Sequence, residues 1–118
     1  MFFKLSSLSQ LAVAAMFMAG AANAEQGWAH LNGTDGLTTR SCGTVCPPTP
    51  FKVALPIDQV NPVKCCATIH ISFNGINTQG TYTDICTNCR GGNITLSEPL
   101  FRQFEPTGDA PFFAVWNQ

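Results

Sequence analysis

Six cysteines are the residues whose type and spacing most clearly predict chemistry in this 118-residue chain. An even number of cysteines in a short chain favours disulfides, provided that the chain folds in an oxidising compartment. Spacing alone does not select one pairing among the many that six cysteines allow. Two of the cysteines are adjacent and would point to opposite faces of a strand, so we expect them to have different partners. The six are Cys42, Cys46, Cys65, Cys66, Cys86 and Cys89.

Two other uses of the cysteines fit the sequence less well. Cys86-x-x-Cys89 with two further thiols is compatible with zinc, but the chain has only two histidines, and an oxidising compartment favours disulfides over metal thiolates. A thioredoxin-like redox function usually places its CxxC motif within a βαβ pattern, and no such pattern surrounds this one. We therefore expect no metal and no other cofactor.

Residues 1–24 have the features of a cleavable signal peptide. Lys4 precedes an uncharged, apolar run over residues 11–22, and Ala22-Asn23-Ala24 fits the small-x-small cleavage pattern. The run is too short to cross a bilayer, which takes about 20 apolar residues. The alternative is a buried or anchoring N-terminal helix. We expect an extracellular, secreted protein that begins at Glu25, with residues 25–118 forming one domain.

The charge of this domain argues against two classes of partner. Without Lys4, five basic and seven acidic residues remain, a net charge of −2. The sequence contains no basic stripe, which argues against nucleic acid, and no polybasic cluster, which argues against an anionic membrane surface.

The elements that must position the cysteines are mostly strands. Residues 67–73 alternate apolar and polar side chains, Asn74-Gly75 follows as a hairpin signal, and residues 80–84 are the expected returning strand. Residues 86–95 are expected to form a loop. Strands are also expected around residues 28–31, 51–57 and 111–116.

One short helix is expected after this loop. Leu96, Leu100, Phe101 and Phe104 recur at helical spacing, and Ser97 is a suitable N-cap. Pro106 and Gly108 would end the helix. One short helix among several strands favours a small closed barrel, which leaves few exposed strand edges.

Five segments, in order, resemble a known family. They are Cys42-Gly43; Lys52-Val53-Ala54-Leu55; Cys65-Cys66-Ala67-Thr68-Ile69-His70-Ile71 with Asn74-Gly75; Tyr82-Thr83-Asp84-Ile85-Cys86-Thr87-Asn88-Cys89; and Ile94-Thr95-Leu96-Ser97 with Phe101 and Val115-Trp116-Asn117. The ordered set resembles the double-psi β-barrel domains of the rare-lipoprotein-A-like group, which includes fungal loosenins and is related to expansins and barwin. The resemblance implies a mainly β, disulfide-stapled, six-stranded barrel over residues 25–118, with a groove across one face.

The resemblance also implies a set of disulfides. The family pattern suggests Cys42–Cys65 and Cys86–Cys89. Cys46 and Cys66 are then additional and would pair with each other. Cys66 occupies a position where the family has glycine.

Asp84 is the residue to which the resemblance assigns chemistry. In lytic relatives the matching aspartate is the acid in the groove, and in expansins it is needed for wall loosening. The alternative is a carboxylate that accepts hydrogen bonds from nearby backbone N–H groups. The family sequence Ala-Thr-x-Tyr-Gly is Ala29-His30-Leu31-Asn32-Gly33 here, and the family Asp-Leu-Ser is Thr95-Leu96-Ser97, so three groove residues differ.

Glycoside hydrolysis normally needs two carboxylates across the scissile bond. Asp35 and Asp58 are candidates for the second, but we expect both to be solvated loop residues. We therefore expect binding without hydrolysis rather than an enzyme.

The remaining candidates are histidines and aromatic residues. His30 could titrate near Asp84, although we favour a surface histidine, and we expect His70 to be exposed. Trp28 and Tyr82 are candidates for stacking on a sugar. The other large aromatic residues are expected in the core: Phe51, Phe73, Phe101, Phe104, Phe112, Phe113 and Trp116.

Two sequons, Asn32-Gly33-Thr34 and Asn93-Ile94-Thr95, are candidates for glycosylation. A glycan at Asn32 would occupy the position of the family's groove tyrosine and would oppose polysaccharide binding there.

Two functions follow from the resemblance. The first is a monomeric, non-lytic, expansin- or loosenin-like protein that binds cell-wall polysaccharide through Asp84, Tyr82, Trp28 and His30. The alternative is an effector or protease-inhibitor-like module that binds a host or other extracellular protein. The two remain open because one fold hosts many functions.

Overall fold

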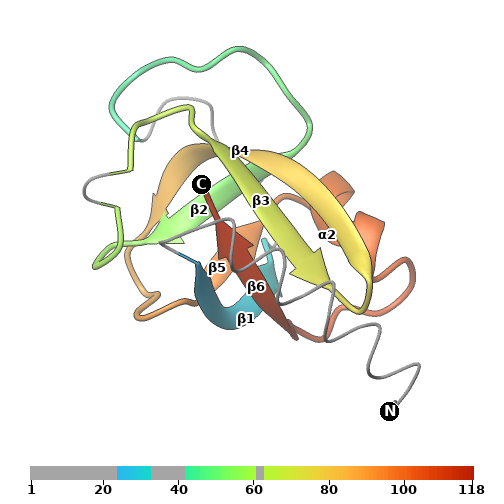
Figure 1. Ribbon diagram of the computed structural model, residues 1–118. Helices are drawn as coiled ribbons and strands as arrows, with labels where there is room; N and C mark the ends of the chain where they lie inside the picture. The colour runs from blue at the N-terminus through green and yellow to red at the C-terminus, as the bar shows by residue number, and fades with distance from the viewer. Residues whose placement is uncertain (1–23, 33–41, 61–62) are drawn as a thin grey trace.

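A computed structural model describes residues 24–32, 42–60 and 63–118 of the chain. The expected signal peptide lies outside these residues except for Ala24. Six strands form a closed barrel in the order β1-β5-β2-β4-β3-β6, and one helix packs against it (Figure 1). The elements are β1 (Glu25–Leu31), β2 (Lys52–Pro56), β3 (Thr68–Phe73), β4 (Ile76–Cys86), β5 (Ile94–Leu96), α2 (Glu98–Phe104) and β6 (Phe112–Asn117).

The barrel mixes parallel and antiparallel pairs. β1 runs parallel to β5, and β2 runs parallel to β4, whereas the other four neighbouring pairs are antiparallel. This closed mixed arrangement leaves no strand edge unpaired in the described sheet. The expectation of a mainly β barrel with one short helix is confirmed.

The core fills the barrel with alternate residues of each strand. Ala29, Val53, Leu55, Ile69 and Ile71 are fully buried, as strand alternation requires for an inward face. Helix α2 closes one side with Leu100, Phe101 and Phe104, and the last two rings pack on Phe112 at centroid distances of 5.3 and 5.1 Å.

The hairpin between β3 and β4 confirms the Asn74-Gly75 signal. Both residues have positive φ, 53° and 80°, which suits the right-handed twist of the flanking strands. β4 is longer than the expected strand at residues 80–84, since it spans Ile76–Cys86.

Two sequence expectations about elements need correction. β5 (Ile94–Leu96) begins inside the segment expected to be a loop, residues 86–95. Ser97 is at the N-cap of α2 but makes no side-chain cap. Its hydroxyl instead donates to Pro50 O at 2.7 Å and accepts from Lys52 N at 2.9 Å, so it ties the helix start to β2.

Three further corrections concern side chains. Phe113, expected in the core, is 50% exposed, because neighbouring strand residues face opposite sides and Phe112 takes the inner side. His70, expected to be exposed, is half-buried. Phe51 and Phe73 are only partly buried against the core.

The structure contains three disulfides, Cys42–Cys65, Cys46–Cys66 and Cys86–Cys89, with Cα–Cα distances of 5.5, 5.4 and 5.3 Å. These are the pairs that the family resemblance implies. Cys65 and Cys66 lie in a turn and not on a strand, yet they bond to different partners as expected.

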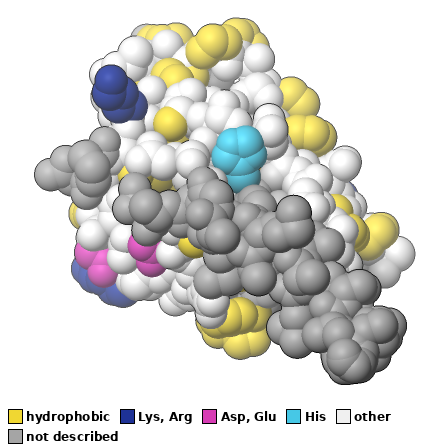
Figure 2. Space-filling model, in the orientation of Figure 1, with side chains coloured by type: hydrophobic (Ala, Val, Ile, Leu, Met, Phe, Trp, Pro, Cys, Tyr) yellow, Lys and Arg dark blue, Asp and Glu magenta, His cyan; other side chains and the backbone are white. Residues whose placement is uncertain are grey.

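Most of the described side chains on the face drawn in Figure 2 are uncharged, with the basic and acidic groups at its margin. Among the described residues, no helix is long and apolar enough to cross a membrane.

Candidate functional site

Strand register aligns four residues across the outside of the barrel. Asp84 on β4 is opposite Ala54 on β2, Ala54 is opposite Thr95 on β5, and Thr95 is opposite His30 on β1. Directly paired residues point to the same side of a sheet. Their chain neighbours, including Val53, point into the core, so the four face outward. We call Asp84, Ala54, Thr95 and His30 the outer row.

A β-bulge sets the direction of the Asp84 side chain. The register between β2 and β4 shifts between Val53 and Ala54, so that Val53 pairs with Tyr82 while Ala54 pairs with Asp84. Thr83 is the extra residue, and bulges of this kind redirect the side chain that follows. Tyr82 therefore points inward and Asp84 outward, only two positions later.

Asp84 lies in a largely desolvated environment. Its side chain is 6% exposed, and Thr83 Oγ1 donates to Asp84 Oδ2 at 3.5 Å. Burial, and secondly the Asp84 charge, raise the pKa of the Tyr82 hydroxyl above 10.0. A buried carboxylate is a hydrogen-bond acceptor suited to a hydroxyl group.

Tyr82 does not form the sugar-stacking surface expected from the sequence. Its side chain is 2% exposed and belongs to the hydrophobic core. Tyr82 is two residues after Gly80 on β4, and both are buried because alternate strand residues share a face.

The Cys86–Cys89 disulfide lies against the middle of the outer row. Thr95 Oγ1 is 3.7 Å from Cys86 Sγ and 3.7 Å from Cys89 Sγ. The disulfide therefore fixes the turn after β4 beside the position where the family has an aspartate.

His30 lies at the far end of the outer row from Asp84. Three strand-to-strand steps separate them, about 14 Å along the sheet at the usual spacing. His30 is exposed, which agrees with the surface histidine that we favoured. The structure does not bring His30 next to Asp84.

Trp28 extends this surface along β1. It is two residues before His30 and so faces the same side, and it is 47% exposed. Its ring meets that of Phe113 edge-on, with centroids 5.4 Å apart and an interplanar angle of 77°. We call Trp28 and Phe113 the aromatic pair.

The candidate second carboxylates do not join the outer row in the described part of the chain. Asp58 is exposed, and its Oδ2 accepts a hydrogen bond from Gly91 N at 3.1 Å, which gives it a structural role in the loop. Asp35 lies outside the described residues.

The two sequons have different surroundings. The Nδ2 atom of Asn32, where a glycan would attach, is buried without a hydrogen-bond partner among the described residues. Asn93 is half-buried, and its Oδ1 accepts from Trp28 N at 2.8 Å. Asn93 thus holds the backbone of Trp28. The other residues of the first sequon, Gly33 and Thr34, are outside the described residues.

Comparison with known proteins identifies the fold. No family model and no curated protein matches the sequence. The apo expansin of Clavibacter michiganensis is similar with a TM-score of 0.67 and 17% identity over 80% of this chain and 50% of that one. An Asp→Asn variant of that expansin, crystallised with cellohexaose, gives a TM-score of 0.66, with the same identity and coverage.

A second kind of protein shares the fold. The Streptomyces papain inhibitor is similar with a TM-score of 0.63 and 21% identity over 82% of this chain and 94% of that one. The chain therefore spans half of the expansin chain but nearly all of the inhibitor. The barrel is the expansin-like double-psi β-barrel, and the likeness to both proteins concerns the fold alone.

Proposed function

We propose that this protein is a secreted, non-lytic polysaccharide-binding protein of the expansin and loosenin kind. The observation that carries the proposal is the alignment of outward-facing strand positions in the outer row and at Trp28, of which Asp84 and Ala54 are buried and His30 and Trp28 are exposed. It places a buried carboxylate acceptor at one end and an exposed indole at the other.

The two ends suit different parts of a sugar chain. A carboxylate accepts hydrogen bonds from sugar hydroxyls, and an exposed aromatic ring covers the apolar face of a pyranose. About 14 Å of sheet, extended by the further step along β1 to Trp28, gives room for several sugar units. The expansin variant crystallised with cellohexaose supports the choice of a polysaccharide, although it shares only 17% identity with this chain.

Binding without hydrolysis follows from the carboxylates. A glycosidase needs a second carboxyl about 5 to 10 Å from the first. Among the described residues, Asp84 is the carboxylate of the outer row, and Asp58 accepts a hydrogen bond from the Gly91 backbone. We therefore expect retention on a polymer without release of sugars.

The proposed export is supported by the three disulfides, which persist in oxidising compartments. N-terminal sequencing of protein from the culture medium tests this point. We expect it to start at Glu25, and protein retained in the cell with Met1 in place would contradict export.

A pull-down with insoluble cellulose, chitin and hemicellulose tests binding itself. We expect at least one of them to retain the protein, and we expect no reducing sugar to appear in the supernatant. Retention on none of them would refute polysaccharide binding, and sugar release would refute the non-lytic assignment.

A second candidate is inhibition of a protease. The specific observation in its favour is that the chain matches 94% of the papain inhibitor but only 50% of the expansin. The aromatic pair offers the exposed apolar surface that protein interfaces favour. An assay against a papain-like cysteine protease separates the candidates, since inhibition that survives Asp84→Ala favours this second function.

A further inference from the structure

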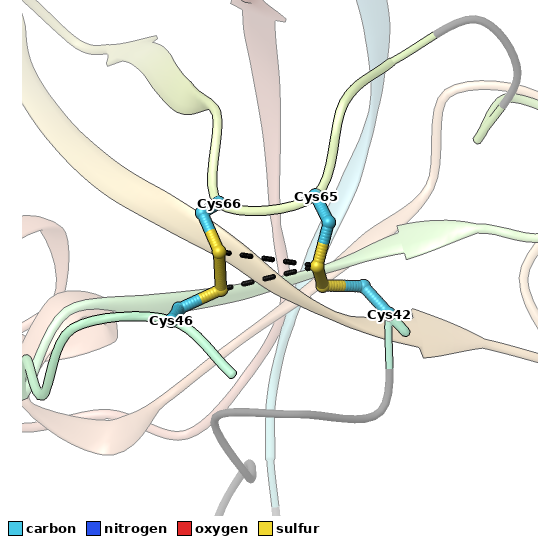
Figure 3. Close-up of side chains that lie close together, drawn as sticks. All are labelled: Cys42, Cys46, Cys65 and Cys66. Atoms are coloured by element: carbon cyan, nitrogen blue, oxygen red, sulfur yellow. Dashed lines mark hydrogen bonds between the residues drawn. A yellow bond between two sulfur atoms is a disulfide. The ribbon is translucent and has the colours of Figure 1, made fainter. Parts of the chain in front are cut away.

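Two disulfides lie side by side near the start of β3. The sulfur atoms of Cys42, Cys46, Cys65 and Cys66 are all within 4.8 Å of one another. Figure 3 shows the Cys42–Cys65 and Cys46–Cys66 bonds facing each other, with Cys65 Sγ 3.9 Å from Cys46 Sγ and 3.9 Å from Cys66 Sγ. A sulfur released from one disulfide is therefore already next to the other.

The backbone of Cys66 accounts for this arrangement. Its φ is +70°, a conformation that residues with a side chain adopt rarely. On a strand, adjacent cysteines would point apart, whereas in this turn both side chains reach one cluster. The same position is a glycine in the resembled family, as such a conformation favours.

The two disulfides differ in their accessibility to a small molecule. Cys42, Cys65 and Cys66 are half-buried, whereas Cys46 is only 2% exposed. A thiol from solution thus reaches the Cys42–Cys65 bond more easily than the Cys46 sulfur. Thiol–disulfide exchange depends on this access and on the proximity of the attacking sulfur.

We propose that Cys42 is a thiolation site for small-molecule thiols. The external thiolate attacks Cys42 Sγ, forms a mixed disulfide there, and releases Cys65 as a thiolate. Cys65 then rotates into line with the neighbouring bond and attacks Cys46 Sγ. The Cys46–Cys65 disulfide forms, the Cys46–Cys66 bond breaks, and the Cys66 thiolate takes up a proton from water.

This sequence needs no oxidant or reductant beyond the thiol itself. Two disulfides and one thiol enter, and two disulfides and one thiol remain, with Cys66 as the final thiol. The second step bonds Cys65 to Cys46, so Cys65 no longer expels the added group directly. We therefore expect the adduct on Cys42 to persist longer than it would beside a free Cys65.

Thiolation would also act on the outer row, an effect that rests on the proposed function. Cys42 N donates to Thr83 O at 2.9 Å, and Cys66 N donates to Tyr82 O at 2.8 Å. These bonds hold β4 at the bulge that directs Asp84. A group added to Cys42 would disturb them, so we expect weaker polysaccharide binding.

Peptide mapping after treatment of the wild-type protein with reduced glutathione tests the site. After acid quenching and alkylation of free thiols, we expect glutathione on Cys42, a Cys46–Cys65 bond and alkylated Cys66 in the same molecules. An adduct with alkylated Cys65 and an intact Cys46–Cys66 bond, or no adduct, would overturn the proposal.

The variant Cys42→Ser tests the exchange step without added thiol. It leaves Cys65 free beside Cys46–Cys66, so we expect both Cys46–Cys66 and Cys46–Cys65 molecules. The matched control Cys86→Ser frees Cys89, which has no second disulfide in its described surroundings and should remain fully alkylated. A single Cys46–Cys66 species in Cys42→Ser would contradict the exchange.

A binding assay with the thiolated protein separates this inference from the proposed function. Unchanged retention on a polysaccharide would overturn the link between Cys42 and the outer row. If the untreated protein is itself not retained, the proposed function fails, while the mapped Cys42 adduct still establishes the thiolation site.

Discussion

Asp84 and Tyr82 are neighbours along β4 that a single bulge residue directs to opposite sides of the sheet. Tyr82 therefore belongs to the hydrophobic core, whereas Asp84 lies on the outer side of β4, where it is 6% exposed. Sequence alternation alone would place both side chains on one face, since they are two positions apart. The bulge at Thr83 is thus the local feature on which the candidate site depends.

Titration of Tyr82 tests this arrangement directly. Tyr82 is the only tyrosine in the sequence, so phenolate absorbance reports it alone. Burial and the Asp84 charge raise its pKa above 10.0, and we expect a midpoint above that value. Asp84→Asn should lower the midpoint, and the same change at exposed Asp58 should not. Equal midpoints in all three proteins would contradict the effect of the Asp84 charge on Tyr82.

The same pKa shift makes stability depend on pH at the alkaline end. A raised pKa means that the folded protein keeps the Tyr82 proton after the unfolded chain has lost it. Stability therefore falls as pH rises above about 10. Urea denaturation at increasing alkaline pH should show this loss, and Tyr82→Phe should reduce its pH dependence. An unchanged dependence in that variant would contradict the assignment.

At the scale of elements, Ser97 links the start of α2 to β2 and the segment before it. Ser97→Ala removes hydrogen bonds to Pro50 O and Lys52 N, and we expect a loss of about 1–3 kcal/mol in the free energy of unfolding. Urea denaturation measures it. Ser72→Ala, on the half-buried side of β3, is the control, and an equal effect of both changes would argue against the link.

The sequence predicts the elements with strong local signals and misses those defined by distant contacts. Ile69 and Ile71 alternate with polar residues, and Asn74-Gly75 is a specific turn signal, so β3 and its hairpin are confirmed. β5 has three residues, too few to show a period. It exists because β1 and β2 pair with it on either side.

Part of the candidate site could also be predicted, because strand alternation indicates which residues of a strand face outward. Trp28 lies at an outward position of β1 as the sugar-binding hypothesis requires. The bulge at Thr83 hides the inward orientation of Tyr82 from a reading of the sequence alone. Phe112 and Phe113 are adjacent aromatic residues, so the sequence does not show which of the two faces outward. The edge-on contact between Trp28 and Phe113 joins residues 85 positions apart in the numbering, and no local pattern signals it.

At the scale of the whole molecule, the two kinds of disulfide contribute differently to stability. Cys46–Cys66 closes a segment of 20 residues, and Cys86–Cys89 closes one of 3. By loop-closure entropy, replacing both cysteines with alanine should cost about 3 kcal/mol for the first pair and about 2 kcal/mol for the second. Thermal or urea unfolding of the two double variants measures the difference, and the opposite order would contradict this account.

The whole barrel also explains how one fold accommodates two candidate functions. Its core and disulfides set the shape, while the outer row and the aromatic pair occupy only the outward positions of strands. Changes at those positions leave the core in place. The expansin and the papain inhibitor share this shape at low identity. The residues at the outward positions would therefore determine which of the two candidate functions this protein has.

Retention of Trp28→Ala on an insoluble polysaccharide that binds the wild-type protein is the most direct test of the account. Val45→Ala is the matched control, because Val45 is a similarly exposed hydrophobic residue, 60% against 47%. We predict about tenfold weaker binding for Trp28→Ala, equivalent to about 1.4 kcal/mol, and unchanged binding for Val45→Ala. Equal binding of all three proteins would contradict the claim that the surface from Asp84 to Trp28 holds the polymer.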